Sequence, residues 1–300
     1  MKEKSYLARK FAQQAYLYAK AVSAQQIRHP RKGLPSMNRA LIHDIPGVRN
    51  FRDMGGYTSK SGGTLAHGRL FRSGHFAEVD AASAAEIAKH NITTVVDFRS
   101  APEKERMQVT WHAPWQPRYI ENPIGGNAAA WIKDLFERVA TAPFPADELH
   151  AQFILAFQTI PIANADGLKK LFDVLVDDDD GGAALFHCTA GKDRTGIAGA
   201  LIMTALDMPE DAIFADFLLT NQAVDLEARA IEAAEQVSEK TGRDVSPEAV
   251  YPLIGVEPDF LHAAFAVMTE EFGSVDNYLT NAIGLTGERR TVLQKRLLTN

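Results

Sequence analysis

Short apolar runs alternate with longer amphipathic stretches along most of the chain, and this alternation predicts an α/β protein. The segments ITTVVDF (92–98) and AALFH (183–187) are continuous apolar runs, typical of strands buried in a parallel sheet. The glycine-dense residues 48–74 predict short strands joined by tight turns, and residues 111–123 predict a loop with an extended segment. Helices are predicted over four further segments, 78–90, 127–140, 146–160 and 164–177.

After the strand at 183–187, the pattern is helical almost to the end of the chain. A glycine-containing loop over 188–196 precedes an apolar helix over 197–206. From Pro209 onward we expect helices with breaks near Gly242, Pro252, Gly273 and Gly284. These patterns predict one domain over 41–300, with a mainly parallel central sheet flanked by helices and with extra helices at the C-terminal end. Residues 209–258 follow this loop without strand partners, so they are a candidate helical lid.

Residues 1–40 differ in character from the rest. Apolar side chains recur at helical spacing, as Leu7, Phe11, Ala15, Tyr18 and Val22. This arm holds nine Lys/Arg and one acid, which gives it a charge of +8, whereas the remaining chain carries −14. The favoured interpretation is a basic amphipathic helix docked on the domain. Peripheral contact with an anionic membrane, or a transit-type or partner-binding arm, are the alternatives.

Composition narrows the class of protein. The 300 residues are 46% hydrophobic and 23% charged, which excludes a disordered or fibrous chain. A net charge of −6 argues against nucleic acid as a partner. No apolar run approaches the ~20 residues of a membrane-spanning helix. The N-terminus lacks the continuous apolar stretch of a secretory signal, so a cytoplasmic location is the default and export by another route is left open.

The segment that carries chemistry is HCTAGKDRTG (187–196), between the apolar strand and the apolar helix. Small residues let successive backbone N–H groups turn inward and form an anion-binding nest, and the positive end of the helix adds to it. Arg194 lies six positions after Cys188 and can return across the loop to grip a phosphate. The same positive field favours the thiolate of Cys188, which is the only cysteine of the chain and therefore forms no internal disulfide. A thiolate at the floor of a phosphate cradle is a nucleophile aimed at phosphorus.

This loop resembles the signature loop of cysteine-dependent tyrosine and lipid phosphatases. It is closest to the atypical bacterial tyrosine phosphatases that have Lys-Asp before the arginine. Three other stretches are similar to patterns of that family: GVRNFRDMGGY (47–57) with LFRSG (70–74), VVDFRS (95–100) with Glu103 soon after, and the ending at 278–298. The resemblance spans roughly 45–300 and implies the cysteine-phosphatase fold.

The resemblance also implies roles for individual residues. Cys188 would attack phosphorus to give a cysteinyl-phosphate, and Thr195 Oγ1 would steady the sulfur as a leaving group. His187 would help to fix the loop and its thiolate. Phosphate would be bound by the loop that follows the cysteine: Thr189, Ala190, Gly191, Lys192, Asp193 and Arg194. Residues 50–56 are interpreted mainly as a scaffold for this loop.

An acid must protonate the leaving oxygen. The Trp-Pro-Asp sequence that supplies it in many related enzymes is absent. Asp193, inside the loop, is the favoured candidate, as the Lys-Asp-Arg resemblance implies. Asp97 is the second, because it ends a predicted parallel strand, where active sites collect. Its plainer role is to pair with Arg99, Arg72 or Arg52.

The resulting prediction is hydrolysis of phosphotyrosine in proteins, with no metal and no other cofactor. Phosphoserine/threonine and phosphoinositides are further candidate substrates. Lys192 would add a mobile charge beside the cradle, which suits substrates with several phosphates, so the alternative is a dedicated phosphoinositide or inositol-phosphate phosphatase. A non-catalytic phosphate-binding module is a third interpretation, and the intact Cys188–Arg194 pair speaks against it.

Overall fold

The computed structural model describes residues 41–125, 146–178 and 181–299. The basic arm over 1–40 and the predicted helix over 127–140 lie outside these residues. A five-stranded sheet forms the centre, in the order β1 (Arg52–Asp53), β3 (Leu70–Ser73), β6 (Ala183–His187), β4 (Ile92–Asp97) and β5 (Arg118–Glu121). β3, β6, β4 and β5 run parallel, whereas the edge strand β1 is antiparallel to β3. The predicted α/β class with a mainly parallel sheet is therefore confirmed.

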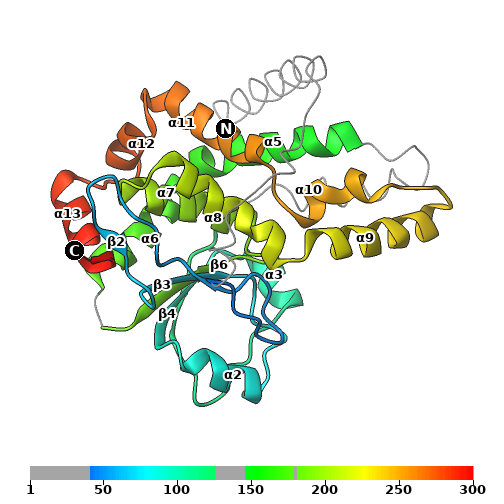
Figure 1. Cartoon of the computed structure of the whole chain (residues 1–300), viewed down its shortest axis with the longest axis horizontal. Helices are drawn as coiled ribbons and strands as arrows, with labels where there is room; N and C mark the ends of the chain where they lie inside the picture. Colours follow the sequence, from blue (N-terminus) through cyan, green and yellow to red (C-terminus); the bar gives the residue numbers. More distant parts are fainter. Residues whose placement is uncertain (1–40, 126–145, 179–180, 300) are drawn as a thin grey trace.

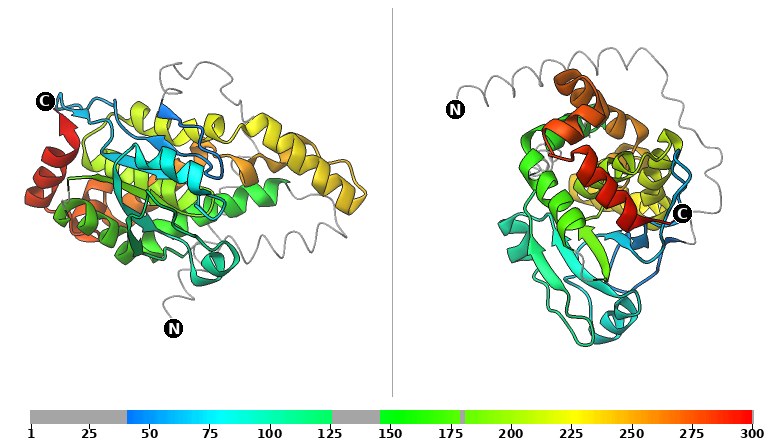
Figure 2. Two further views of the ribbon diagram at one scale, coloured as in Figure 1. Left: turned by 90° about the horizontal axis from the view of Figure 1, so that it is seen from below. Right: turned by 90° about the vertical axis from the view of Figure 1, so that its left-hand side faces the viewer.

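Helices cover both faces of this sheet (Figure 1). On one face lies α2 (Ala81–Ala88), and α3 (Ala101–Arg106) follows β4. The other face carries most of the helices: α5 (Ala146–Ala163), α6 (Ala165–Asp177), α7 (Asp193–Ala205), α8 (Glu210–Ala223), α11 (Pro258–Phe272), α12 (Val275–Asn281) and α13 (Gly287–Leu297). The right-hand view of Figure 2 shows the same layering, with α2 (cyan) on the side of the sheet away from the larger helical layer.

The central strands β6 and β4 are buried on both faces because alternate side chains enter two different cores. In β6, Leu185 packs with the α2 core and Phe186 with the core of the larger helical layer. Val95 and Val96 of β4 divide in the same way. A strand with apolar neighbours on both sides needs no polar alternation, which is why these segments read as continuous apolar runs.

Two details of the C-terminal half were not predicted. The helix after the loop begins at Asp193 instead of 197, so Asp193 and Arg194 occupy its first turn. An acidic residue in the first turn complements the helix dipole. The chain also ends on a short strand, β7 (Leu298–Thr299), which pairs with β2 (Thr64–Leu65). A strand of two residues is too short to show an alternating or apolar pattern in the sequence.

The candidate lid over 209–258 is not uniform. It comprises α8, α9 (Leu226–Thr241), a 3₁₀ turn at Pro247–Val250 and α10 (Tyr251–Ile254). α8 is part of the core, because Ile213, Asp216 and Phe217 are buried on it. This part of the prediction is wrong, and only α9 to α10, which extend beyond the sheet in Figure 1, remain a candidate lid.

No helix within 41–125, 146–178 or 181–299 has the length and apolar character needed to cross a membrane.

Candidate active site

The loop after β6 is built as a cradle of backbone donors. Strand β6 ends at His187, and α7 begins at Asp193, so the N-terminus of α7 faces the loop. Within the described residues, no protein oxygen accepts a hydrogen bond from the backbone N–H groups of residues 189–194. Cys188, 2% exposed, lies at the start of this loop. Unpaired N–H groups at a helix N-terminus bind a phosphate, so the predicted cradle has the required donors.

Two buried side chains hold the loop from behind through one carbonyl. Gly191 O accepts hydrogen bonds from Asn50 Nδ2 at 2.8 Å and from Arg72 Nη2 at 3.0 Å. Asn50 in turn accepts from Arg52 Nη1. The scaffold role expected for this part of residues 50–56 is thereby confirmed. Asp53 instead holds the neighbouring turn, where its carboxylate accepts from the N–H groups of Gly55 and Gly68, both at 2.8 Å.

Asp216 on α8 completes this support. Its carboxylate accepts from Arg52 Nε at 3.0 Å and from Arg72 Nη1 at 2.6 Å. All three side chains are almost fully buried. Burial alone would raise the pKa of Asp216, but the two guanidiniums outweigh it and hold this pKa below its usual value. No sequence motif indicates Asp216, because a lone aspartate in a helical pattern carries none.

Gly191 is required by its backbone conformation and its surroundings. Its φ is +71°, and a Cβ there would lie 2.4 Å from the backbone C and O of Ser73. Gly68 has the same φ of +71°, but a Cβ there would meet nothing within 4 Å. The two glycines therefore separate the cost of the conformation from the cost of the contact.

Gly68→Ala is expected to lower the free energy of unfolding by about 1 kcal/mol, the penalty for a left-handed alanine. Gly191→Ala should lower it by about 3 kcal/mol, because the backbone must also move away from Ser73. Urea denaturation of both variants measures the difference. Equal losses would show that the contact between the loop and β3 is not tight.

Arg194 is held by Glu103 at the start of α3. Its Nη2 lies 2.6 Å from Glu103 Oε1 and its Nη1 lies 2.9 Å from Oε2, a bidentate ion pair. Glu103 also accepts from Thr189 Oγ1 at 2.5 Å and from the N–H of Ser100, whose helix cap it completes. Burial opposes ionisation of Glu103, yet the hydrogen bond and charge of Arg194 hold its pKa far below the usual range. One carboxylate thus fixes Arg194 beside the cradle.

His187 and Asp97 lie at the ends of the adjacent parallel strands β6 and β4. Burial lowers the pKa of His187 to about 4, against the attraction of Asp97, so the ring is neutral near pH 7. Its Nδ1 lies 3.0 Å from Cys188 O and donates to it in the tautomer that this contact requires. The distance from Nε2 to Asp97 Oδ1 is 3.7 Å, which is too long for a hydrogen bond. His187 therefore fixes the backbone at Cys188.

The carboxylate of Asp97 is already occupied. It accepts from Arg99 at 2.8 and 2.9 Å and from the hydroxyl of Tyr119 at 2.6 Å. Burial opposes its ionisation, but neighbouring His187 and these hydrogen bonds keep its pKa below the usual value. Asp97 has no proton to donate and is 0% exposed. Of the three arginines expected as partners, the structure brings Arg99 to Asp97.

The prediction of a mobile charge at Lys192 is wrong. The side chain is 5% exposed, and its Nζ donates to the carbonyl oxygens of Pro252 at 2.9 Å and Gly255 at 3.2 Å. It also lies 3.1 Å from Asp193 Oδ1 and 4.3 Å from the centre of the Phe153 ring. Four partners hold this ammonium among α5, α10 and the loop, so it ties α10 to the cradle.

Thr195 lies one residue after Arg194 in α7 and is fully buried. Its Oγ1 has no hydrogen-bond partner among the described residues, the sulfur of Cys188 included. A buried hydroxyl without a partner is free to donate a hydrogen bond when a group beside it becomes negatively charged. The role expected for Thr195 therefore stays a prediction.

Known proteins match most of the chain. Residues 43–299 match the model of the tyrosine phosphatase family. A protein of Cupriavidus necator that bears the name of a tyrosine-protein phosphatase is 31% identical over 236 residues, or 79% of this chain and 82% of that protein. The triple specificity protein phosphatase PtpB of Mycobacterium tuberculosis is 28% identical over 281 residues, or 80% of this chain and 94% of PtpB.

Among solved structures, TpbA of P. aeruginosa is 14% identical with a TM-score of 0.28, over 64% of this chain and 89% of TpbA. The family match covers the loop with Cys188 and Arg194 and the segments that hold it. The chain therefore belongs to the tyrosine phosphatase family and is a protein-tyrosine phosphatase.

Proposed function

We propose that the protein hydrolyses phosphotyrosine in proteins through a cysteinyl-phosphate formed on Cys188, without a metal ion. The observation that carries this proposal is the loop itself. Cys188 stands at the start of a turn whose N–H groups from 189 to 194 find no acceptor in the part of the chain that the structure describes, and Glu103 fixes Arg194 beside them. This arrangement binds a phosphate dianion directly in front of a thiolate.

In the first step, the thiolate of Cys188 attacks phosphorus and the bond from phosphorus to the tyrosine oxygen breaks. The N–H groups of the loop and the guanidinium of Arg194 bind the equatorial oxygens, where negative charge is concentrated. The carboxylic acid of Asp193 gives its proton to the departing phenolic oxygen.

In the second step, a water molecule attacks the cysteinyl-phosphate. Asp193, now a carboxylate, takes one proton from that water, and the bond from sulfur to phosphorus breaks to release phosphate and the thiolate. Thr195 Oγ1 would then donate to the sulfur and stabilise it as it leaves. His187 holds the carbonyl of Cys188 and keeps the sulfur in place.

The environments of the two candidate acids support Asp193. Asp97 is buried and accepts from Arg99 and Tyr119, so its carboxylate is ionised and shielded. Asp193 lies in the first turn of α7, and a quarter of its side chain is exposed. Lys192 Nζ, 3.1 Å from one oxygen of Asp193, fixes its position beside the cradle.

The test of the proposal is to trap the intermediate. The enzyme is mixed with a phosphotyrosine peptide in EDTA, quenched in acid within milliseconds, and analysed by intact mass and peptide mapping. We expect one added phosphate on Cys188 and full turnover in EDTA. Turnover without an adduct, or turnover that EDTA abolishes, would contradict the mechanism. Phosphate binding without turnover would support the non-catalytic module.

Asp193→Ala tests the acid through the leaving group. We expect kcat for a phosphotyrosine peptide to fall about a hundredfold, since the phenolic oxygen then leaves without a proton. The loss for p-nitrophenyl phosphate should be much smaller, because its leaving group is far less basic. Equal losses for both substrates would mean that Asp193 does not donate the proton.

Phosphoserine and phosphothreonine are proposed as weaker substrates, as the similarity to a triple specificity phosphatase suggests. A preference for phosphoinositides loses its main support in the structure, because Lys192 is held by carbonyl oxygens. Peripheral contact of residues 1–40 with an anionic membrane stays a proposal. The ratio of kcat/KM for phosphopeptide and soluble phosphoinositide decides between the two substrate classes.

A further inference from the structure

A cavity of about 570 Å³ opens beside the phosphate cradle. Ala190 of the cradle lies in its lining. The loop over 44–49 and Glu78 form one wall. The opposite wall comes from the end of α8, the first two turns of α9 and the end of α10. The volume is that of a ligand site, and the position is where groups attached to a bound phosphate would lie.

The charges on these walls are mainly negative. Four acids line the cavity, against two arginines: Asp44, Glu78, Asp225 and Glu232, with Arg49 and Arg229. Arg229 Nη1 lies 3.3 Å from Glu232 Oε2, so these two charges offset each other within α9 and leave three acids against Arg49. The surplus of acids therefore faces whatever enters the cavity.

We infer that this cavity binds the residues next to phosphotyrosine in a protein substrate and selects segments rich in lysine and arginine there. This inference rests on the function proposed above. The cradle binds the negatively charged phosphate. The carboxylates of the cavity attract positive charge on residues a few positions away in the substrate. A segment with cationic neighbours around an anionic side chain complements both.

The negative charge of the cavity walls disfavours phosphoinositides as substrates. A phosphoinositide head group brings several negative charges near the bound phosphate, and in this cavity they would meet carboxylates.

Backbone hydrogen bonds fix the position of the cavity next to the cradle, because Gly74 joins the cavity wall to the cradle. Its N–H donates to Arg49 O at 2.7 Å, and the next N–H, of His75, donates to Thr189 O at 3.1 Å. The wall is thus fixed relative to the phosphate.

The experiment compares two phosphotyrosine peptides that differ only in four flanking positions, lysine in one and glutamate in the other. For the wild type at low salt, we expect kcat/KM to favour the lysine peptide about tenfold, since each exposed pair contributes a small factor. The preference should shrink in 0.5 M salt, where such pairs are screened. A soluble phosphoinositide serves as a third substrate.

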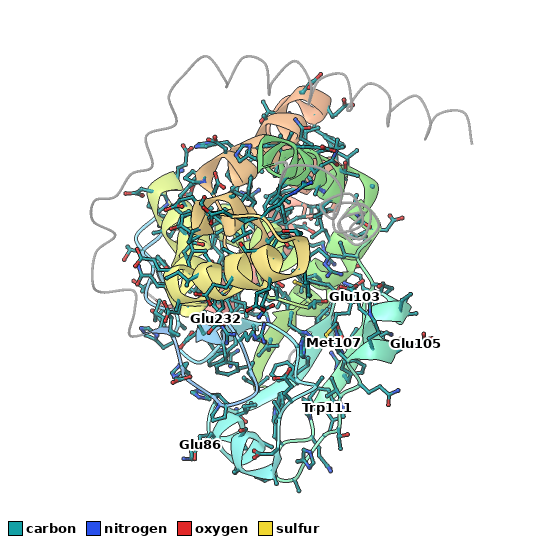
Figure 3. The ribbon with its side chains drawn as sticks, turned by 90° about the vertical axis from the view of Figure 1, so that its right-hand side faces the viewer. Glu86, Glu103, Glu105, Met107, Trp111 and Glu232 are labelled. Atoms are coloured by element: carbon teal, nitrogen blue, oxygen red, sulfur yellow. The ribbon has the colours of Figure 1, made fainter. Side chains whose placement is uncertain are left out.

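A double charge reversal, Glu78→Lys with Glu232→Lys, changes both walls. It should reduce the ratio between the peptides to about one or invert it. Glu86→Lys is the matched control. Glu86 is an exposed residue of α2, which Figure 3 shows at the far lower end of the molecule from Glu232. This variant should keep the wild-type ratio.

The outcomes of this experiment distinguish failure of the inference from failure of the proposed function. Turnover of both peptides at equal efficiency, an unchanged ratio in the double variant, or a preference for the phosphoinositide would overturn the inference and leave the phosphatase activity standing. Hydrolysis of neither peptide would overturn the proposed function, and the inference with it.

Discussion

Cys188→Ser is expected to lower kcat for a phosphotyrosine peptide by about 10⁴- to 10⁶-fold. A serine hydroxyl stays protonated at neutral pH, so the field of Arg194 and the loop N–H groups has no anion to stabilise as a nucleophile. The substitution replaces only the sulfur atom of Cys188. It therefore leaves the backbone N–H donors and the ion pair between Arg194 and Glu103 unchanged. Single-turnover kinetics with a phosphotyrosine peptide measures the loss.

The same variant should still bind the peptide, because the cradle is intact. Calorimetry with the peptide is expected to give an affinity close to the KM of the wild type. Cys188→Arg serves as the opposite control, since its side chain would fill the cradle and abolish binding as well. A Cys188→Ser enzyme that keeps a substantial fraction of the wild-type kcat would refute the cysteinyl-phosphate.

The elements that sequence predicts well are those whose residues share one environment. Strand β6 and the segment of β4 are buried on both faces, so their apolar character is visible without any partner. The cradle is predictable for a related reason. Its glycine, cysteine and arginine act within one short loop, where spacing alone sets the geometry.

What sequence could not predict depends on partners far along the chain. Lys192 looks like a free cation beside a phosphate, yet its ammonium binds carbonyls 60 and 63 residues away. Glu103 follows a recognisable segment, but nothing local shows that it fixes Arg194, 91 residues later. Asp97 appears available at the end of a strand, whereas Tyr119 from the next strand occupies it. Long-range pairing decides each of these roles.

The support of the cradle by α8 is the strongest such case. Asp216 is the anion between Arg52 and Arg72. Arg72 and Asn50 donate to the carbonyl of Gly191, and Arg52 donates to Asn50. Burial and the neighbouring Arg52 lower the pKa of Arg72 to about 10, so it remains charged at neutral pH. Two buried cations close together are tolerated because one carboxylate neutralises part of their charge.

Asp216→Ala is therefore expected to lower the free energy of unfolding by about 3–5 kcal/mol, because two buried guanidiniums lose their counter-charge. Asp211→Ala is the matched control. Asp211 lies exposed in the first turn of the same helix, and its loss should cost below about 1 kcal/mol. Urea denaturation at pH 7 compares the two. A loss for Asp216→Ala no larger than that of the control would show that this network does not stabilise the fold.

Asp216→Asn separates charge from shape. Because the pKa of Asp216 is depressed in the folded protein, its charge stabilises the fold above the unfolded value near 3.8, and this contribution is lost as the pH falls through the lower folded value. The stability difference between wild type and Asp216→Asn should stay constant from pH 7 to about pH 5 and shrink only in stronger acid. At pH 7, where the variant is still folded, kcat/KM should fall as well, since Arg72 no longer fixes Gly191. An unaltered kcat/KM would limit Asp216 to stability and leave the cradle to hold itself.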